Sequence, residues 1–312
     1  MKYRKSAALN LPISEIGFGT WPLSGDVRGT MAYGKTDDKE SKKALARALE
    51  LGINFYDVSD LYGFGHVESL MGEVFKHDRE KIVITTKGGM LSMQGDQDFS
   101  TRHLSKSLKG SLKRLKTDYV DIYMLHSPPL LVLENRLLQL LEKFKKDGLV
   151  REFGISLRSP KDGYDAILDY GIKIIEVNYN LLDHRCDHIG LFDLCEKHKV
   201  TAIIRTPLSQ GILSGKFRFN SDKSDRRNQW DKEKVRSLML VYKEMVEYIT
   251  GDRRTDSQNS LRFCLSKSQV TSVIPGMKCV EEVEENVLAS QYGPLLESDL
   301  KNIESVYVRN GL

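Results

Sequence analysis

Short apolar runs rich in Ile and Val recur along the chain, and each is followed by a longer stretch in which Leu, Ala and Lys recur at helical spacing. This alternation predicts parallel strands connected by helices. The predicted strands are residues 16–20, 54–58, 82–86, 120–125, 152–156, 174–178, 202–205 and 272–275. The predicted helices include residues 38–51, 67–75, 101–115, 135–146, 190–198 and 280–289. Eight strands with helices between them favour a closed barrel over an open sheet.

The length of 312 residues agrees with that architecture. Barrels of alternating strands and helices commonly exceed ~250 residues as one unit, so we expect residues 1–312 to be a single (β/α)8 TIM barrel domain. Residues 217–234, which are rich in Asp, Arg, Asn and Ser, are predicted to be a long loop after the seventh strand. Residues 298–309 are predicted to be a terminal helix that covers the barrel.

Composition and charge narrow the classes of partner. The chain is 40% hydrophobic and 29% charged, with a formal charge of +4 and with basic and acidic residues interspersed. This pattern disfavours nucleic acid and mildly favours small anions. No signal peptide or window of ~18 apolar residues is present, so we expect a cytoplasmic protein without a membrane partner, either a monomer or a small homo-oligomer. The four cysteines form no CxxC pair, which argues against a disulfide framework or a zinc site.

Polar residues follow or end most of the predicted strands. In a parallel barrel the loops at the carboxyl ends of the strands meet at one mouth, and the active site is expected there. The strands end at 19–21, Asp57, Lys87, His126, Ser156, Asn178, Arg205 and Gly276. So many polar groups would be costly to bury without partners, whereas a ligand in the mouth would supply them.

Three of these strand ends, Asp57, Lys87 and His126, together with Tyr62 in the loop after Asp57, suggest carbonyl reduction. Hydride addition builds negative charge on the carbonyl oxygen, which an acid must neutralise. Tyr62, five residues after Asp57, is the candidate proton donor, and the ammonium of Lys87 is expected to lower its pKa from ~10. Asp57 would keep Lys87 charged, and His126 would orient the carbonyl oxygen. Each residue alone has an ordinary structural explanation, but four at successive strand ends favour a catalytic group.

The order Asp57, Tyr62, Lys87, His126, with its flanking residues, resembles the aldo-keto reductase superfamily, and the resemblance extends from residues 17–21 to 284–286. It implies an NADPH-dependent oxidoreductase that reduces an aldehyde or ketone to an alcohol, with sugar-type carbonyls among the expected substrates. The same fold resembles potassium-channel β subunits, so a nucleotide-binding regulatory subunit is the alternative. A metal-dependent hydrolase is disfavoured because the first strand offers Gly19 and Thr20 in place of histidines.

No GxGxxG motif follows the first strand, so a Rossmann clamp is not predicted. The resemblance instead implies a dinucleotide extended across the mouth. In it Arg205 stacks on the nicotinamide, Ser156 and Glu176 contact the carboxamide, Lys278 contacts the 2′-phosphate, and the segment 205–216 folds over the pyrophosphate. The full set of implied contacts is Thr20, Trp21, Asp57, Ser156, Glu176, Arg205, Thr206, Leu208, Gln210, Gly211, Lys216, Arg227, Gly276, Lys278, Glu282, Glu285 and Asn286, the last two at the adenine.

Three positions depart from the family pattern: Glu282, Glu176, and Leu157, which stands where an asparagine often follows the serine. Glu282 stands where many members have Gln or Arg, and a carboxylate there would repel a 2′-phosphate. NADPH is still expected because Lys278 and Arg227 are basic, and NADH is the alternative. Glu176 stands where members often have glutamine. Substrate choice is assigned to the loops 25–35, 90–99 and 128–134.

Two further motifs are given structural explanations. His184 and His188 are four residues apart, but no third metal ligand follows from the spacing, so we predict no metal site. The lysines of 106–116 alternate with Ser and Leu at helical spacing and are predicted to form the solvated face of a helix.

Overall fold

The chain folds into a (β/α)8 barrel, as predicted. A computed structural model describes residues 1–29, 32–250 and 254–312. Within those residues, eight parallel strands pair in chain order. They are β3 (Phe18–Gly19), β4 (Phe55–Asp57), β5 (Val83–Gly88), β6 (Val120–His126), β7 (Val150–Ser156), β8 (Ile174–Asn178), β9 (Thr201–Arg205) and β10 (Val270–Ile274). Parallel bridges from Ile16 to Val273 and from Gly19 to Gly276 close the barrel.

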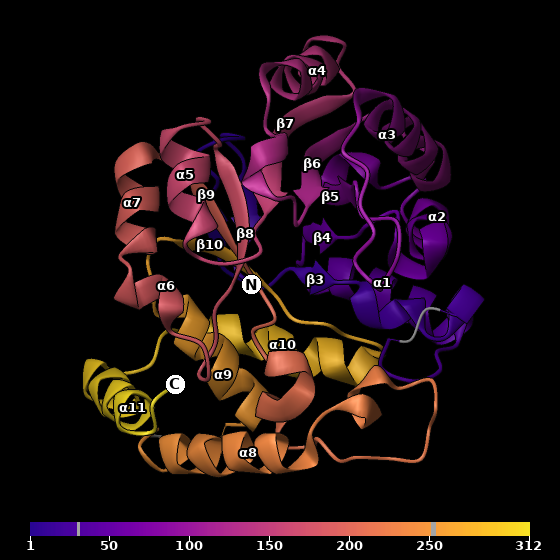
Figure 1. The fold of residues 1–312 in the computed structure, drawn as a ribbon. Helices are drawn as coiled ribbons and strands as arrows, with labels where there is room; N and C mark the ends of the chain where they lie inside the picture. The colour runs from indigo at the N-terminus through magenta and orange to yellow at the C-terminus, as the bar shows by residue number, and fades with distance from the viewer. Residues whose placement is uncertain (30–31, 251–253) are drawn as a thin grey trace.

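Helices surround the strands (Figure 1). They are α1 (Asp38–Glu50), α2 (His66–Val74), α3 (Thr101–Leu115), α4 (Asn135–Lys146), α5 (Asp162–Leu168), α6 (Arg185–His188), α7 (Leu191–His198), α8 (Lys232–Glu247), α9 (Asp256–Leu265), α10 (Val280–Tyr292) and α11 (Glu297–Arg309). The last of these is the predicted terminal helix, and it packs against α8. No helix in the described ranges is long and apolar enough to cross a membrane.

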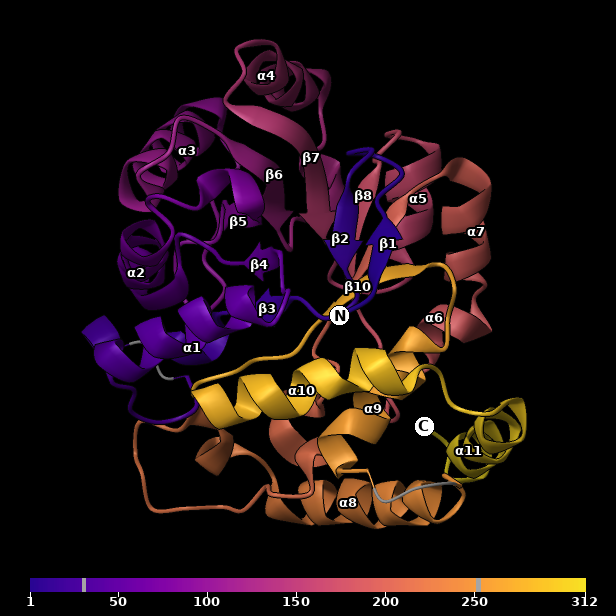
Figure 2. The same cartoon turned by 180° about the vertical axis from the view of Figure 1, so that it is seen from behind.

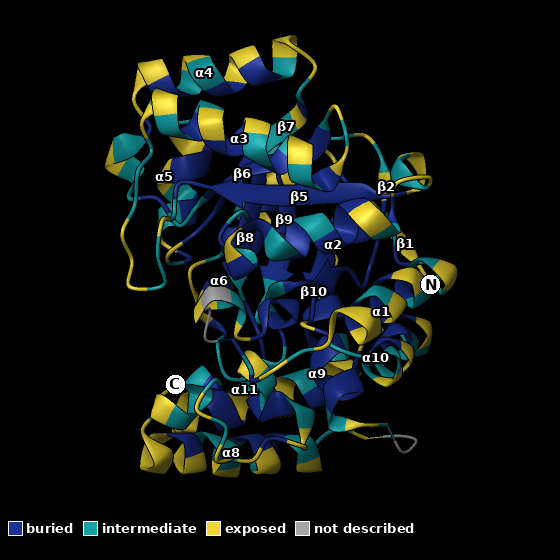
Figure 3. Cartoon of the chain, turned by 90° about the vertical axis from the view of Figure 1, so that its right-hand side faces the viewer, coloured by how far each residue is buried: buried dark blue, intermediate teal, exposed yellow. Residues whose placement is uncertain are grey.

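The barrel interior is filled with apolar side chains that come from successive strands. This cluster comprises Ile13, Phe55, Val83, Ile122, Met124, Ile174, Ile203 and Ile274. A second, larger cluster lies between the strands and the helices. Figure 3 shows the strands buried and the outer faces of the helices exposed. The interior is therefore a packed core, and open space is confined to the ends of the barrel.

An antiparallel hairpin covers the amino-terminal end of the barrel (Figure 2). It is formed by β1 (Tyr3–Lys5) and β2 (Pro12–Ser14), and it inserts Ile13 into the interior cluster. The Ser6 hydroxyl lies 2.8 Å from that of Thr201, and the Ser14 amide donates to Asn54, so the hairpin is bound to the starts of β9 and β4. Neither strand contains an apolar run of the kind that marks the barrel strands, which explains why the pattern did not predict them.

The segment predicted as a long loop is only partly irregular. A short 3-10 helix occupies Arg226–Gln229, and α8 begins at Lys232 with Asp231 as its N-cap. Helix α9 was not predicted, because the residues buried on it include the polar run 257–260. Its start is defined instead by a capping box between Thr255 and Gln258. Both helices lie beside the loop that follows β9, so they shape one side of the mouth.

Helices α2 and α3 approach closely at Gly72. A Cβ atom there would lie 2.2 Å from the backbone oxygen of Arg114, which the packed helix cannot vacate. We expect Gly72→Ala to lower the free energy of unfolding by about 1–3 kcal/mol through overpacking. Gly110→Ala in α3 is the matched control, because its added Cβ meets only the far end of the Arg114 side chain, at Nη1, and no backbone atom. That control should leave stability unchanged or raise it by about 0.5–1 kcal/mol. Urea denaturation of both variants measures the difference, and equal stabilities would contradict the close helix contact.

Candidate active site

A buried ammonium group with two carboxylates lies at the carboxyl end of the barrel. Lys87 Nζ, from β5, is 2.5 Å from each carboxylate oxygen of Asp57, the last residue of β4. It is also 3.2 Å from Glu176 Oε2 on β8, although the angle there does not satisfy a hydrogen bond. The three side chains are at most 3% exposed. Because one cation faces two potential anions, the cluster has an excess of negative charge when all three groups are ionised.

Tyr62 and His126 lie beside this cluster. Lys87 Nζ is 5.4 Å from the centre of the Tyr62 ring. The rings of Tyr62 and His126 meet edge to face with centroids 6.1 Å apart, and Trp21 packs edge to face on the other side at 5.1 Å. The structure thus brings together all four residues that the sequence proposed as a catalytic group. Three of them lie at the carboxyl ends of the neighbouring strands β4, β5 and β6, and Tyr62 lies in the loop after β4.

The charges in this cluster determine its protonation. Burial opposes the charged form of Lys87, but Asp57 and Glu176 outweigh it, and the pKa of Lys87 is raised. Burial also raises the pKa of Asp57 well above its ordinary value, and Glu176 adds to the rise while Lys87 opposes it. Lys87 therefore remains an ammonium, and Asp57 has an increased tendency to retain a proton.

The two rings are neutral in the free chain. Burial raises the pKa of Tyr62 above its ordinary value, and the charge of Lys87 opposes the rise without overcoming it. The net shift is therefore opposite to the lowering expected from the sequence, because the phenol is buried and much of the ammonium charge is already balanced by carboxylates. Burial, with the positive charges of Lys87 and Arg205, holds the pKa of His126 well below its usual range.

A cavity of about 810 Å³ opens above these residues. Asp57, Tyr62 and His126 line it, whereas Lys87 is not among its lining residues. The predicted cofactor contacts that line it are Trp21, Asp57, Glu176, Arg205, Thr206, Leu208, Gln210, Gly211, Lys216, Arg227, Gly276, Lys278, Glu282, Glu285 and Asn286. Thr20 and Ser156 do not. Thr20 donates to the backbone oxygen of Asp57, and Ser156 donates to Glu176 Oε1, so both support lining residues from behind.

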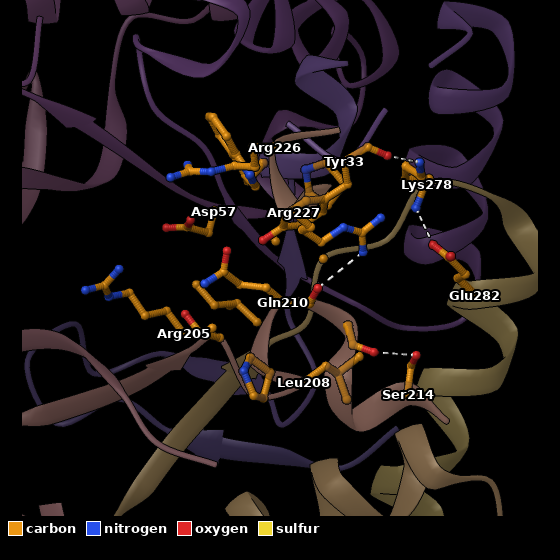
Figure 4. A pocket seen from close by; sticks show the side chains of 18 of the residues that line it. Tyr33, Asp57, Arg205, Leu208, Gln210, Ser214, Arg226, Arg227, Lys278 and Glu282 are labelled. Carbon is orange, nitrogen blue, oxygen red and sulfur yellow. Dashed lines mark hydrogen bonds between the residues drawn. The ribbon is translucent and has the colours of Figure 1, made fainter. Parts of the chain in front are cut away.

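Lys278 and Glu282 lie on the side of the cavity away from Asp57, and Arg227 lies between them and Asp57 (Figure 4). Lys278 Nζ donates to the backbone oxygen of Tyr33, and the amide of Lys278 donates to the carboxylate of Glu282 at 2.6 Å. Arg227 forms a two-pronged ion pair with Asp225 and also donates to the backbone oxygen of Gln210. Arg227 is thus partly neutralised, and Glu282 is held by a backbone donor.

The segment after β9 crosses the cavity with an unusual backbone. Thr206, Ser209 and Gln210 all have positive φ angles, a conformation that costs free energy for residues other than glycine. At its end Lys216 forms a 2.6 Å ion pair with Glu285 on α10. The lysine and glutamate that were assigned to phosphate and adenine are therefore paired with each other across the cavity.

Several buried polar atoms around the cavity have no hydrogen bond among the described residues. They are Arg205 Nε, Glu176 Oε2 and Glu285 Oε1. All three residues line one cavity. Glu176 Oε2 still faces the Lys87 ammonium at 3.2 Å, whereas Arg205 Nε is a buried donor without an acceptor, which is costly. The walls therefore suit a large ligand that carries both hydrogen-bonding groups and negative charge, as a nicotinamide dinucleotide does.

Sequence reasoning did not identify every lining residue. Tyr33, Arg218, Arg226 and Ser257 also line the cavity. Arg218 and Arg226 lie in the segment predicted as a loop. The signal available there was that Arg226 directly precedes Arg227, which the sequence did single out. Tyr33 belongs to the loop 25–35 that was assigned to substrate choice, of which residues 30 and 31 lie outside the described residues.

The histidine pair at α6, with His184 as the N-cap and His188 as the last residue of the helix, has a structural role. The carboxylate of Glu304 lies 2.7 Å from the Nδ1 atom of His184 and 2.8 Å from the Nε2 atom of His188. The His184 ring also stacks on the ring of Tyr307. No group of three or more metal-binding side chains occurs among the residues that the structure describes. The four cysteines are unpaired.

Comparisons with known proteins agree with this geometry. The model of the Aldo/keto reductase family matches residues 15–308. The aldo-keto reductase AKR11C1 from Bacillus halodurans, solved in its holo form, superposes with a TM-score of 0.79 at 28% identity, over 98% of this chain and 96% of that one. An NADH-specific methylglyoxal reductase of Escherichia coli is 27% identical over 93% of each chain. A probable voltage-gated potassium channel subunit beta of Arabidopsis thaliana is 27% identical over 95% of this chain and 93% of its own.

The second carboxylate on Lys87 should influence how stability depends on pH. Because the pKa of Asp57 is raised in the folded chain, its contribution to stability is greatest at low pH and is lost as the pH rises through the raised value. Glu176→Gln removes the negative charge that contributes to the raised pKa of Asp57. We expect this variant to be more stable than the parent by about 1 kcal/mol at pH 8, with a smaller gain at pH 5. Thermal unfolding at both pH values measures the effect.

Glu285→Gln is the control for that experiment, because Glu285 pairs with Lys216, and no second carboxylate of the described residues lies within ion-pair distance of that lysine. This control should show no gain at pH 8. A loss of stability in Glu176→Gln at pH 8 would mean that Glu176 is needed to balance Lys87.

Proposed function

The chain belongs to the aldo/keto reductase family, whose members are oxidoreductases acting on carbonyls and alcohols, and we propose that it is an NADPH-dependent reductase of aldehydes or ketones, including sugar-type carbonyls. The observation that carries the proposal is the group at the floor of the cavity: a neutral phenol and a neutral imidazole beside a buried ammonium. These are the groups that a carbonyl oxygen requires when it gains negative charge.

Tyr62 is the proposed proton donor. Its raised pKa means that the phenol stays protonated in the resting chain, so a proton is available when an alkoxide forms. A bound reduced nicotinamide supplies the hydride to the carbonyl carbon. As the oxygen becomes basic, the proton passes from Tyr62 to it, and the carbonyl becomes an alcohol. Lys87 lowers the free energy of the phenolate left behind, because its ammonium lies 5.4 Å from the ring.

The remaining members of the group position charge. Asp57 binds Lys87 through both oxygens and keeps the ammonium protonated despite burial. His126 is neutral and lies at the cavity beside Tyr62, so one ring nitrogen is available to hold the carbonyl oxygen without adding a positive charge that would compete for the proton.

NADPH is the proposed cofactor. Three basic residues, Lys278, Arg226 and Arg227, line the cavity, and Lys278 lies on the side away from Asp57 (Figure 4). The carboxylate of Glu282 would repel a 2′-phosphate, but it accepts a hydrogen bond from the Lys278 amide, which stabilises it in place and partly offsets its charge. The NADH-specific name of the Escherichia coli relative makes NADH the alternative. The unpaired cysteines suit the reducing conditions of the cytoplasm, where we place the enzyme.

A regulatory role is the second candidate, because the channel-subunit name of the Arabidopsis thaliana relative applies to a chain of the same fold and similar length. The two candidates differ in turnover. Tight nucleotide binding without reduction of any compound in a panel of aldehydes and ketones would favour the regulatory role, whereas reduction of panel members favours the enzyme.

Removing the Tyr62 hydroxyl tests the proton donor. Tyr62→Phe should lower the turnover number by at least about 10²-fold with a broad aldehyde such as nitrobenzaldehyde, because no positioned acid remains. Binding of NADPH, followed by fluorescence, should change less than about twofold. Tyr119→Phe makes the same change at a tyrosine outside the cavity lining and should leave turnover unchanged. Unaltered turnover in Tyr62→Phe would refute the assignment.

Cofactor choice is tested at Lys278. Lys278→Met should weaken NADPH binding about tenfold while NADH binding changes less than about twofold, since only NADPH carries the 2′-phosphate. Raising the salt concentration should narrow the difference. Lys301→Met, on the exposed face of α11, is the control for a lost positive charge. If Lys278→Met weakened the binding of NADPH and NADH equally, the assignment of Lys278 to the 2′-phosphate would be wrong.

A further inference from the structure

A serine hydroxyl is buried directly behind His126. Ser59 follows β4 and is fully buried, and its Oγ lies 3.1 Å from His126 Nδ1. The Leu61 amide donates to the same hydroxyl oxygen at 3.2 Å. Ser59 does not line the cavity, so it reaches the site only through the imidazole.

Ser59 has one proton and three acceptors within reach. His126 Nδ1 is the nearest, whereas Asp60 Oδ1 and the backbone oxygen of Lys87 are each 3.4 Å away. Hydroxyl hydrogen bonds weaken as they lengthen beyond about 3 Å, so the proton goes preferentially to the nearest acceptor. The backbone oxygen of Lys87 already accepts from the Asp60 amide. The Asp60 carboxylate accepts from Ser107 at 2.5 Å through its other oxygen, Oδ2, which is a much shorter hydrogen bond than the 3.4 Å contact with Ser59.

The direction of this hydrogen bond decides which nitrogen of His126 carries the proton. A neutral imidazole has one N–H, and if Nδ1 accepts from Ser59 the N–H must be at Nε2. Nε2 has no hydrogen-bond partner among the described residues, and the ring lines the cavity. In the opposite tautomer Nε2 would be an acceptor, which cannot hold a carbonyl oxygen.

We propose that Ser59 is a positioning residue that holds His126 as the Nε2–H tautomer, ready to donate a hydrogen bond to the carbonyl oxygen. The inference rests on the proposed carbonyl reduction for its consequence, but the tautomer itself is a property of the chain without ligands. The burial of His126 beside Lys87 and Arg205 supports it, because both charges disfavour a second proton on the ring.

The tautomer is measured directly by long-range ¹H–¹⁵N correlation spectra of the full chain labelled with ¹⁵N-histidine. The chain has seven histidines, and comparison with His126→Asn assigns the signals of residue 126. At pH 7.5 the unaltered chain should show a protonated Nε2 and an unprotonated Nδ1 at His126. A protonated Nδ1, or a doubly protonated ring, would overturn the proposal without any variant having to fold.

Ser59→Ala then tests what the hydroxyl does. We expect a mixture of the two tautomers in the spectra, and a turnover number about tenfold lower, the cost of one misdirected hydrogen bond. Binding of NADPH should be unchanged. Ser41→Ala is the matched control, because Ser41 is buried on α1 and its hydroxyl has no hydrogen-bond partner in the described part of the chain. It should alter neither the spectra nor the turnover.

The outcomes separate this inference from the proposed function. An Nε2–H tautomer that is lost in Ser59→Ala, in a chain that reduces no carbonyl compound, would support the positioning and refute the reductase. Normal reduction with an unchanged tautomer in Ser59→Ala would support the reductase and refute the positioning. A slower Ser59→Ala variant whose His126 signals match those of the parent would also refute it, because the defect would then be structural.

Discussion

Lys87 is fully buried at the carboxyl end of the barrel, and its ammonium is tolerated there because the carboxylates of Asp57 and Glu176 lie against it. Removing an isolated charge from water costs far more than a folded domain can spare, so this group of charges can exist only as a unit. The other features of the site follow from it. The ring of Tyr62 lies next to a permanent positive charge. Burial and the nearby charge of Lys87 lower the pKa of His126, so its imidazole stays neutral.

The barrel supplies the rigidity that such a charge cluster needs. Its members lie on β4, β5 and β8, which are far apart in the sequence but converge at one end of a packed interior. Bridges between the first and last strands close the sheet, and the amino-terminal hairpin covers the opposite end. Chemistry is therefore possible at one end only. Behind the residues that line the cavity lie the hydroxyl groups of Thr20, Ser59 and Ser156. They hold the lining residues in place through hydrogen bonds.

The far end of the cavity has a different electrostatic character. Positive side chains dominate, but most are already bonded within the chain: Arg227 to Asp225, Lys216 to Glu285, and Lys278 to a backbone oxygen. A ligand with phosphate groups would compete with these internal partners, so its binding involves exchange of ion pairs in addition to simple attraction. The strained backbone around Thr206 and Gln210 lies in the segment that lines the cavity and ends at Lys216.

The sequence by itself determined the (β/α)8 architecture, because eight apolar runs separated by helical periods have few other solutions, and it placed Asp57, Tyr62, Lys87 and His126 near one mouth by strand order alone. It did not reveal β1 and β2, which contain no apolar run, or α9, whose buried face is polar. Only the tertiary structure decided how charges are shared. Glu176 faces Lys87, Lys216 pairs with Glu285, and Ser59 lies behind His126, because such contacts join strands and loops whose distances no local pattern encodes. For the same reason the sequence predicted a lowered pKa for Tyr62, whereas burial, which arises only on folding, raises it.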